Sequence, residues 1–66
     1  MGDVEEVGRV IRAARKEDRL TQKDLADPAG TSERTVRAIE TGTGNPALTT
    51  VAAAAGVFGL RLAVEQ

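Results

Sequence analysis

The sequence predicts an all-α fold of four short helices, with one β-strand added at the C-terminal end. Apolar side chains recur at three- and four-residue steps in several segments separated by polar loops. Good N-cap residues precede these segments, and glycine or proline interrupts them. With 66 residues, the chain is predicted to form a single domain over residues 1–66. The helices are expected at about residues 4–18, 21–28, 33–41 and 46–55.

The first predicted helix covers about residues 4–18 and is amphipathic. Asp3 is a candidate N-cap, and Glu6 stands three residues further on, as in a capping box. The basic residues of this helix are balanced by acidic neighbours, which favours an ordinary charged surface. The alternative is a face that lies along a phosphate strand. The apolar stripe comprises Val4, Val7, Val10, Ile11 and Ala14, and the basic residues that recur on the outer face are Arg9, Arg12, Lys16 and Arg19.

The second predicted helix, about residues 21–28, begins at a capping box. Thr21 is the expected N-cap, and Asp24 is its acidic partner. Pro28 cannot donate an amide to the carbonyl of Asp24, and therefore we expect the helix to kink or end at this proline. Gly30 then allows a sharp turn. The inward-facing residues are Leu25 and Ala26.

The third predicted helix, about residues 33–41, starts after the N-cap Ser32 and ends at Gly42. Val36 and Ile39 stand three residues apart and are predicted to be its buried seam. The outward residues are Arg34, Thr35, Arg37, Ala38 and Thr41.

The fourth predicted helix, about residues 46–55, follows a loop rich in glycine. Asn45 is its expected N-cap, and Pro46 occupies the first helical position, where a missing amide costs nothing. Gly56 is expected to end the helix. The predicted inner face is formed by Leu48, Val51, Ala52 and Ala55.

The period changes from helix to strand in the last segment, "VFGLRLAVEQ". Large apolar side chains alternate there with small or charged ones, which predicts a strand at about residues 60–65. Because no second strand is predicted, its partner would be the same strand of a second copy, related by a two-fold axis. A frayed tail is the alternative. The predicted dimerisation residues are Phe58, Leu60, Leu62 and Val64.

The composition excludes several classes of function. The sequence has no Cys and no His, and therefore we predict no metal site, no cofactor and no catalytic residues. Nine Lys and Arg stand against ten Asp and Glu, giving a net charge of −1, so any nucleic-acid partner must be held locally. No apolar run approaches about 20 residues, and the N-terminal segment is acidic. These features predict a soluble cytoplasmic protein.

The spacing of several motifs resembles that of a known family. The pattern consists of Arg15 near a helix end, then "LTQKDLA", Gly30, "TSERTVRAIETG" and a loop containing "NP". Over about residues 8–58 it resembles the phage-repressor (Cro-like, XRE) helix-turn-helix proteins, which have a lambda-repressor-like DNA-binding domain. The ending "GLRLAVEQ" resembles that of HipB-type antitoxins. Those antitoxins dimerise partly through such a strand, repress their own operon and hold a toxin kinase inactive.

The resemblance implies a homodimeric, sequence-specific transcriptional regulator that binds a palindromic operator in double-stranded DNA through residues 33–41. It favours an antitoxin-like autorepressor, associated with the bacterial nucleoid, with a HipA-like toxin kinase as a further partner. By matched position, Arg15 and Glu40 are implied to form a partly buried ion pair. The implied DNA-binding residues are Gln22, Lys23, Ser32, Glu33, Arg34, Thr35, Arg37, Ala38, Thr43 and Asn45.

The chemistry of Arg34 and Arg37 supports this role independently. Residues three apart project from one side of a helix, and an arginine can donate two hydrogen bonds to guanine, worth about 1–3 kcal/mol of discrimination. A solvated helix face is the alternative interpretation. The alternative function is a protein-interaction module that binds a toxin, with weak or no DNA binding.

Two features depart from the family pattern. Pro28 stands where the family keeps a helix former, which bears on the angle between the second and third helices. Glu33 and Ala38 are less able to read bases than the amide side chains that are common at these positions.

Overall fold

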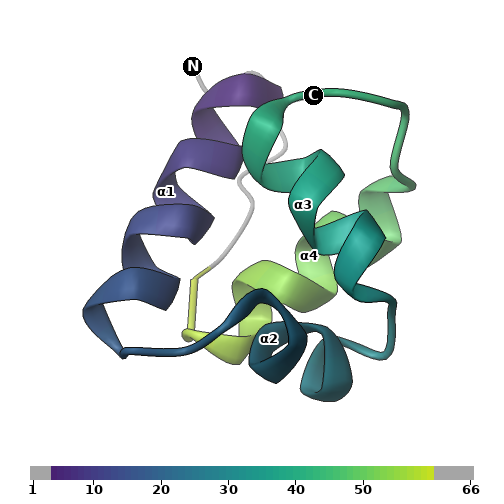
Figure 1. Ribbon diagram of the computed structural model, residues 1–66. Helices are drawn as coiled ribbons and strands as arrows, with labels where there is room; N and C mark the ends of the chain where they lie inside the picture. The colour runs from purple at the N-terminus through teal and green to yellow at the C-terminus, as the bar shows by residue number, and fades with distance from the viewer. Residues whose placement is uncertain (1–3, 61–66) are drawn as a thin grey trace.

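The computed structural model describes the backbone of residues 4–60 and the side chains of residues 6–60. It contains four α-helices, and this confirms the predicted all-α fold over the described residues. The predicted strand at 60–65 lies outside them except for Leu60, which is not in a strand. The helices are α1 (Val4–Glu17), α2 (Gln22–Ala29), α3 (Glu33–Thr41) and α4 (Leu48–Val57) (Figure 1).

The core lies where α3 packs against both α1 and α2, and α4 closes it by packing against α2 (Figure 1). The predicted seam of Val36 and Ile39 is confirmed, since both side chains are fully buried. Helix α4 contributes mainly small side chains, which allow it to pack closely. The core residues are Ile11, Leu25, Ala26, Ala29, Val36, Ile39, Val51, Ala54 and Ala55.

Helix α1 turns a narrower apolar face to the core than the sequence predicts. Ile11 is buried and Val7 is partly buried against the core, but Val10 is 49% exposed. The prediction that Val10 faces inward is therefore wrong. Helix α1 meets α3 through the face that carries Gly8, Ile11 and Arg15, all of which are buried, and this places Val10 at the edge of the contact.

Helix α2 ends at Ala29, one residue after Pro28 and close to the end that the sequence predicts. Pro28 is the last residue but one and is exposed, so its missing amide removes one hydrogen bond from the final turn only. Gly30 takes the left-handed conformation (φ 71°) and caps the helix. Its amide donates to the carbonyl of Asp27 at 3.2 Å.

The predicted capping box at the start of α2 is confirmed. The amide of Asp24 donates to the Thr21 hydroxyl at 3.0 Å, and the amide of Thr21 donates to the Asp24 carboxylate at 2.9 Å. The hydrogen bonds from the backbone and then from the side chain of Thr21 lower the pKa of Asp24. The short helix is therefore fixed at its first turn as well as at its last.

Helix α4 starts and ends later than predicted. Its N-cap is Ala47, in an extended conformation without a side-chain hydrogen bond, so the prediction that Asn45 caps a helix starting at Pro46 is wrong. The helix also continues through Gly56, and Gly59 (φ 72°) makes the turn instead. Because the amide of Leu60 bonds to the carbonyl of Ala55 at 3.0 Å, the last turn closes in the manner of a Schellman motif.

The predicted inner face of α4 is only partly correct. Val51 and Ala55 are buried, but Ala52 is exposed and Leu48 is 63% exposed. Leu48 begins the helix, and the first buried residue of α4 is Val51, three residues later. Ala54 completes the inner face in place of Ala52. The helix therefore leaves part of its apolar surface uncovered.

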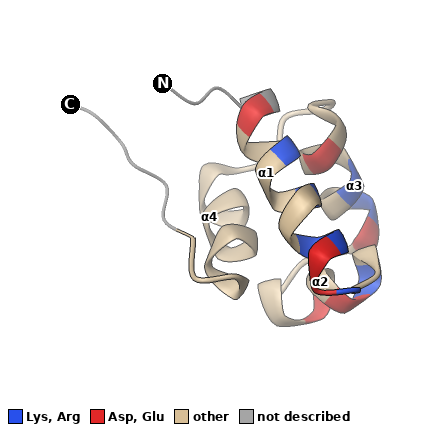
Figure 2. Ribbon diagram, turned by 90° about the vertical axis from the view of Figure 1, so that its left-hand side faces the viewer, with Lys and Arg blue, Asp and Glu red and all other residues tan. Residues whose placement is uncertain are grey.

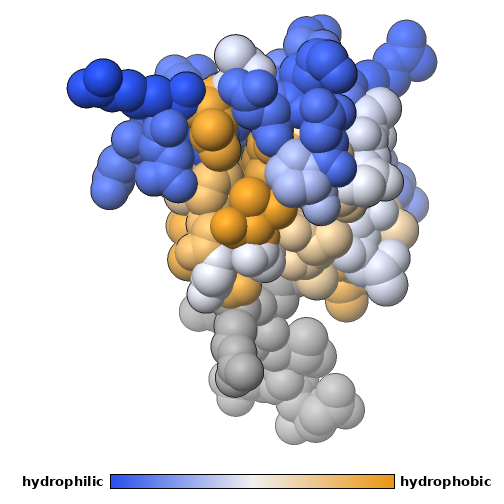
Figure 3. All heavy atoms as spheres, turned by 90° about the horizontal axis from the view of Figure 1, so that it is seen from below, coloured by the Kyte–Doolittle hydropathy of each residue, from blue (hydrophilic) through white to orange (hydrophobic). Residues whose placement is uncertain are grey.

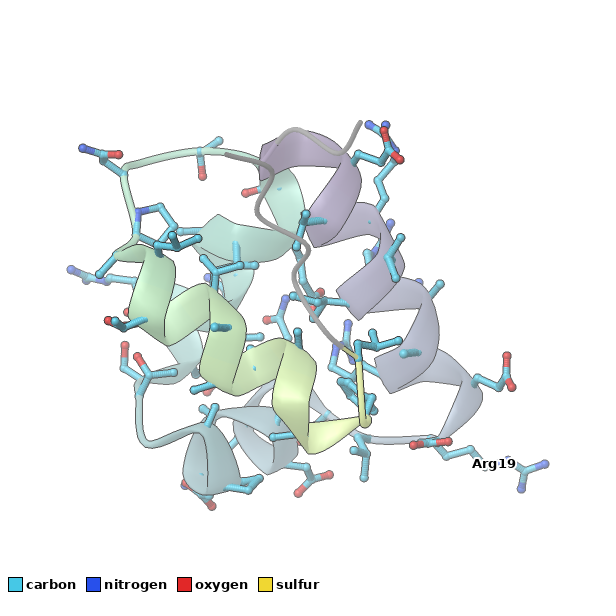
Figure 4. The ribbon with its side chains drawn as sticks, turned by 180° about the vertical axis from the view of Figure 1, so that it is seen from behind. Arg19 is labelled. Carbon is cyan, nitrogen blue, oxygen red and sulfur yellow. The ribbon has the colours of Figure 1, made fainter. Side chains whose placement is uncertain are left out.

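Arg19 forms the corner between α1 and α2 and has a left-handed backbone conformation, with φ 59°. The amide of Arg19 donates to the carbonyl of Lys16 at 3.0 Å, and that of Leu20 donates to the carbonyl of Arg15 at 3.0 Å. The side chain points away from the body of the molecule (Figure 4). This is a helix-ending turn in which glycine is the common residue.

We expect the substitution Arg19→Gly to stabilise the fold by about 1 kcal/mol, because it removes the cost of a left-handed conformation for a side chain with a Cβ atom. The matched control is Arg12→Gly, at an exposed helical position of α1, which should destabilise by about 1 kcal/mol. Urea unfolding followed by circular dichroism measures both. A destabilised Arg19→Gly variant would contradict the assigned turn.

Candidate nucleic-acid interface

Helices α2 and α3 are joined by a short turn, residues 30–32, and both ends of α3 are capped. Ser32 accepts a hydrogen bond from the amide of Thr35 at 3.1 Å, and Gly42 closes the last turn. The hydrophobic seam of α3 faces α1 and α2. The opposite side of α3 is consequently turned to solvent.

The solvent-facing side of α3 carries most of the predicted DNA-binding residues. Arg34 is exposed, and its side chain makes no hydrogen bond or ion pair with any residue from 6 to 60. Arg37 has a side chain that is 64% exposed and lies 4.0 Å from the carboxylate of Glu33. Thr35 and Ala38 are half-buried beside them. The structure therefore brings two guanidinium groups to one exposed helix face.

Arg15 and Glu40 lie beneath this face as a buried ion pair that joins α1 to α3. The Arg15 Nε donates to Glu40 Oε2 at 2.7 Å, and its Nη2 donates to Oε1 at 3.0 Å. The side chains are only 11% and 1% exposed. The hydrogen bond to Glu40 raises the pKa of Arg15 above its ordinary value, so the guanidinium keeps its positive charge within the ion pair.

Gln22, at the start of α2, lies between this ion pair and the exposed face. Its Nε2 donates to Glu40 Oε1 at 3.3 Å, and its Oε1 accepts from Arg37 Nε at 3.4 Å. Lys23, the next residue, points elsewhere and pairs with Asp27 at 3.4 Å. The two neighbouring residues of α2 thus have different environments.

The loop after α3 is held against the end of the helix. The amide of Thr43 donates to the carbonyl of Ala38 at 3.0 Å, and the hydroxyls of Thr41 and Thr43 are 2.8 Å apart. Asn45 is exposed further along the loop. Exposed hydroxyl and amide groups therefore stand beside the C-terminal end of α3.

This arrangement has the order and geometry of a helix-turn-helix motif, and comparison with known proteins agrees. The family model described as Helix-turn-helix matches residues 11–64. The chain belongs to the phage-repressor-like (XRE) helix-turn-helix family. This confirms the predicted family.

A curated relative of this helix-turn-helix chain is named immunity repressor protein and comes from Bacillus phage phi105. It is 43% identical over 56 residues, which cover 85% of this chain and 39% of the relative. The chain therefore spans well under half the length of this relative. The family and the relative also confirm the prediction that the chain is a DNA-binding module and not an enzyme.

Within the described residues 4–60, the charged side chains lie on α1, α2 and α3 and on the connections between them. Residues 41–60 contain no charged side chain, and α4 is uncharged throughout (Figure 2). Among residues 4–60, no helix is long and apolar enough to cross a bilayer. Positive side chains can therefore gather locally on α1 to α3 although the net charge of the chain is −1.

Two features of the helix-turn-helix domain are not predicted from the sequence. The first is Gly8, whose missing side chain allows α1 to approach the backbone of α3 near Ile39. A glycine in the middle of an amphipathic pattern is the signal that could have indicated it. The second is the contact of Gln22 with Arg37, for which the sequence contains no signal.

Proposed function

We propose that the chain is a sequence-specific DNA-binding transcriptional repressor. The observation that carries this proposal is the solvent-facing side of α3, where Arg34 and Arg37 are exposed on a helix whose opposite side is buried. A helix presented in this way can enter the major groove. The name of the phage relative, an immunity repressor protein, supports repression over activation.

Each predicted DNA-binding residue has a role in this proposal. Arg34 and Arg37 read base edges, and Thr35 and Ala38 contact the groove beside them. The remaining residues position the domain through phosphate contacts. Ser32 is the residue whose side chain is least free to turn toward a phosphate, because its hydroxyl already caps α3 and lies 3.0 Å from the Thr35 hydroxyl. The phosphate-contacting residues are Gln22, Lys23, Ser32, Thr43 and Asn45, with Glu33 at the edge of the groove.

We further propose that two copies bind a palindromic operator, with their α3 helices about 10 base pairs apart. Phe58 and Leu60 are partly buried against the core of their own domain, so only part of each remains for a partner. Leu62 and Val64 lie outside the described residues. The alternation of apolar residues from 58 to 64 supports pairing of this segment between two copies.

A second candidate function is an antitoxin-like interaction with a toxin kinase. It is favoured by the uncharged stretch 41–60 together with Leu48, which is 63% exposed. Seen from below, hydrophobic and neutral residues occupy much of the molecular surface, and hydrophilic residues lie along one edge (Figure 3). This surface suits a protein partner better than it suits DNA.

A salt series of fluorescence-anisotropy titrations tests the first function against the second. The probes are a duplex enriched from a randomised library by the native chain and an unrelated duplex of equal length. We expect affinity for the enriched duplex to fall steeply with salt, with a slope of about −0.9 per phosphate contact. The variant Arg34→Ala should lose about 1–3 kcal/mol of preference for the enriched duplex.

The matched control is Arg9→Ala, which removes the same charge from an exposed position of α1 and should leave the preference unchanged. Equally weak binding of both duplexes by the native chain would contradict the DNA-binding proposal. That result would favour the protein partner, whose apolar interface should be much less sensitive to salt.

A further inference from the structure

We propose that Gln22 is a positioning residue that fixes the direction of Arg37 and thereby sets the preference for the base pair that Arg37 reads. The proposal rests on the proposed DNA-binding function and adds to it a specificity role for a residue of α2. Its basis is a continuous series of hydrogen bonds, in the order Arg15, Glu40, Gln22 and Arg37, that runs from the core to the exposed face of α3.

The orientation of the Gln22 amide follows from its neighbour. A carboxylate only accepts hydrogen bonds, and Glu40 Oε1 lies 3.3 Å from Gln22 Nε2, so the nitrogen must face Glu40. The amide oxygen is then turned toward α3, where it lies 3.4 Å from Arg37 Nε. Glu40 cannot turn to release the amide, because Arg15 binds both of its carboxylate oxygens. The buried pair therefore dictates which atom Gln22 offers to Arg37.

Both hydrogen bonds of Gln22 are long, and consequently they set direction more than they add stability. Arg37 has a second restraint, since its Nη2 lies 4.0 Å from the carboxylate of Glu33, one turn earlier on the same helix. With Nε directed at Gln22, the terminal nitrogens remain as the edge that can donate to guanine. The guanidinium is thus held at one side by α2 and at another by α3.

Arg34 provides the contrast within the same helix. Its side chain makes no hydrogen bond or ion pair to the described part of the chain, so it must lose more side-chain freedom when it binds a base. The Arg37 side chain is already restricted in the free protein by its contacts with Gln22 and Glu33. Replacement of Gln22 should therefore reduce the preference for the base pair that Arg37 contacts. The preference for the base pair that Arg34 contacts should stay unchanged.

The test is a double-mutant cycle between Gln22→Met and Arg37→Ala, with base preference as the readout. Methionine keeps the length and helix propensity of glutamine but makes neither hydrogen bond. The probes are the duplex enriched by the native chain and a set of duplexes with one base pair changed at a time. Each preference is a ratio of two Kd values measured on one sample, so a change in the folded fraction cancels.

We expect Arg37→Ala to abolish the preference at one base pair, a loss of about fivefold or more. Gln22→Met should reduce the preference at that same base pair, and the double variant should lose no more than Arg37→Ala alone. The matched control is Lys23→Met on the same turn of α2. It should weaken binding to all duplexes equally, as the loss of a phosphate contact does.

Two results would overturn this role for Gln22. One is that Gln22→Met weakens binding to all duplexes equally, as Lys23→Met does, since this would make Gln22 a phosphate contact only. The other is that its effect adds to that of Arg37→Ala, or falls at a different base pair. If the native chain enriches no duplex from the randomised library, the proposed function is wrong, and the proposed role of Gln22 is wrong with it.

Discussion

The substitution Gly8→Ala is expected to destabilise the domain by about 3 kcal/mol, at the upper end of the range for overpacking a core. A Cβ atom at this position would collide with the carbonyl oxygen of Ile39, and would lie 3.1 Å from its carbonyl carbon and 3.3 Å from Glu40 Cα. These are backbone atoms, which cannot rotate out of the way as a side chain could. Helix α1 would have to move away from α3 as a whole.

Two facts make this effect large. A domain of 66 residues has a total stability of about 3–10 kcal/mol, so this loss is a substantial fraction of it. It also outweighs the gain in helix propensity, about 1 kcal/mol, that alanine normally brings. Urea unfolding of the native chain and the variant measures the difference in the free energy of unfolding.

Gly56→Ala is the matched control, because Gly56 also lies inside a helix but a Cβ atom there would meet nothing within 4 Å. It should stabilise the domain by about 1 kcal/mol. The two Gly→Ala substitutions are thus expected to have opposite signs. A Gly8→Ala variant as stable as the native chain would mean that α1 and α3 do not approach each other closely.

The substitution Arg15→Met is expected to cost about 3–5 kcal/mol. It leaves Glu40, whose side chain is 1% exposed, with only the hydrogen bond from Gln22 at 3.3 Å. It also leaves the carbonyl of Leu20 without the guanidinium that donates to it at 2.7 Å. DNA binding should weaken as a consequence, because α3 is then held less firmly against α1.

The double variant Arg15→Met/Glu40→Met separates the buried charge from a loss of packing. It removes both members of the pair and should recover much of the lost stability, since apolar replacement of a buried ion pair is often neutral or stabilising. Thermal unfolding of the single and double variants makes the comparison. A double variant as unstable as Arg15→Met would show that the stranded charge is not the cause.

The parts of the fold that the sequence predicts are those defined by local signals. The capping box of Thr21 and Asp24 fixes the start of α2, and the N-cap Ser32 fixes the start of α3. The outward residues of α3 follow from Val36 and Ile39, because a helix that buries one side must expose the other. These inferences need no knowledge of the neighbouring helices.

The parts that the sequence does not predict depend on tertiary contacts. Helix α4 starts after Ala47, which has no side-chain cap, and so no local residue marks its beginning. The contact of Gly8 with Ile39 spans 31 residues of sequence, and the hydrogen bond of Gln22 to Arg37 spans 15. Such pairs are decided by how the helices pack, and a periodicity argument treats each helix separately.

The most direct test of the central claim, that the solvent-facing side of α3 binds DNA, is a map of amide chemical-shift changes by NMR as the enriched duplex is added. We predict that the largest changes occur in residues 33–38, with further changes at the start of α2 and in residues 43–45. Changes confined to α4 and Phe58, with α3 unaffected, would contradict the claim.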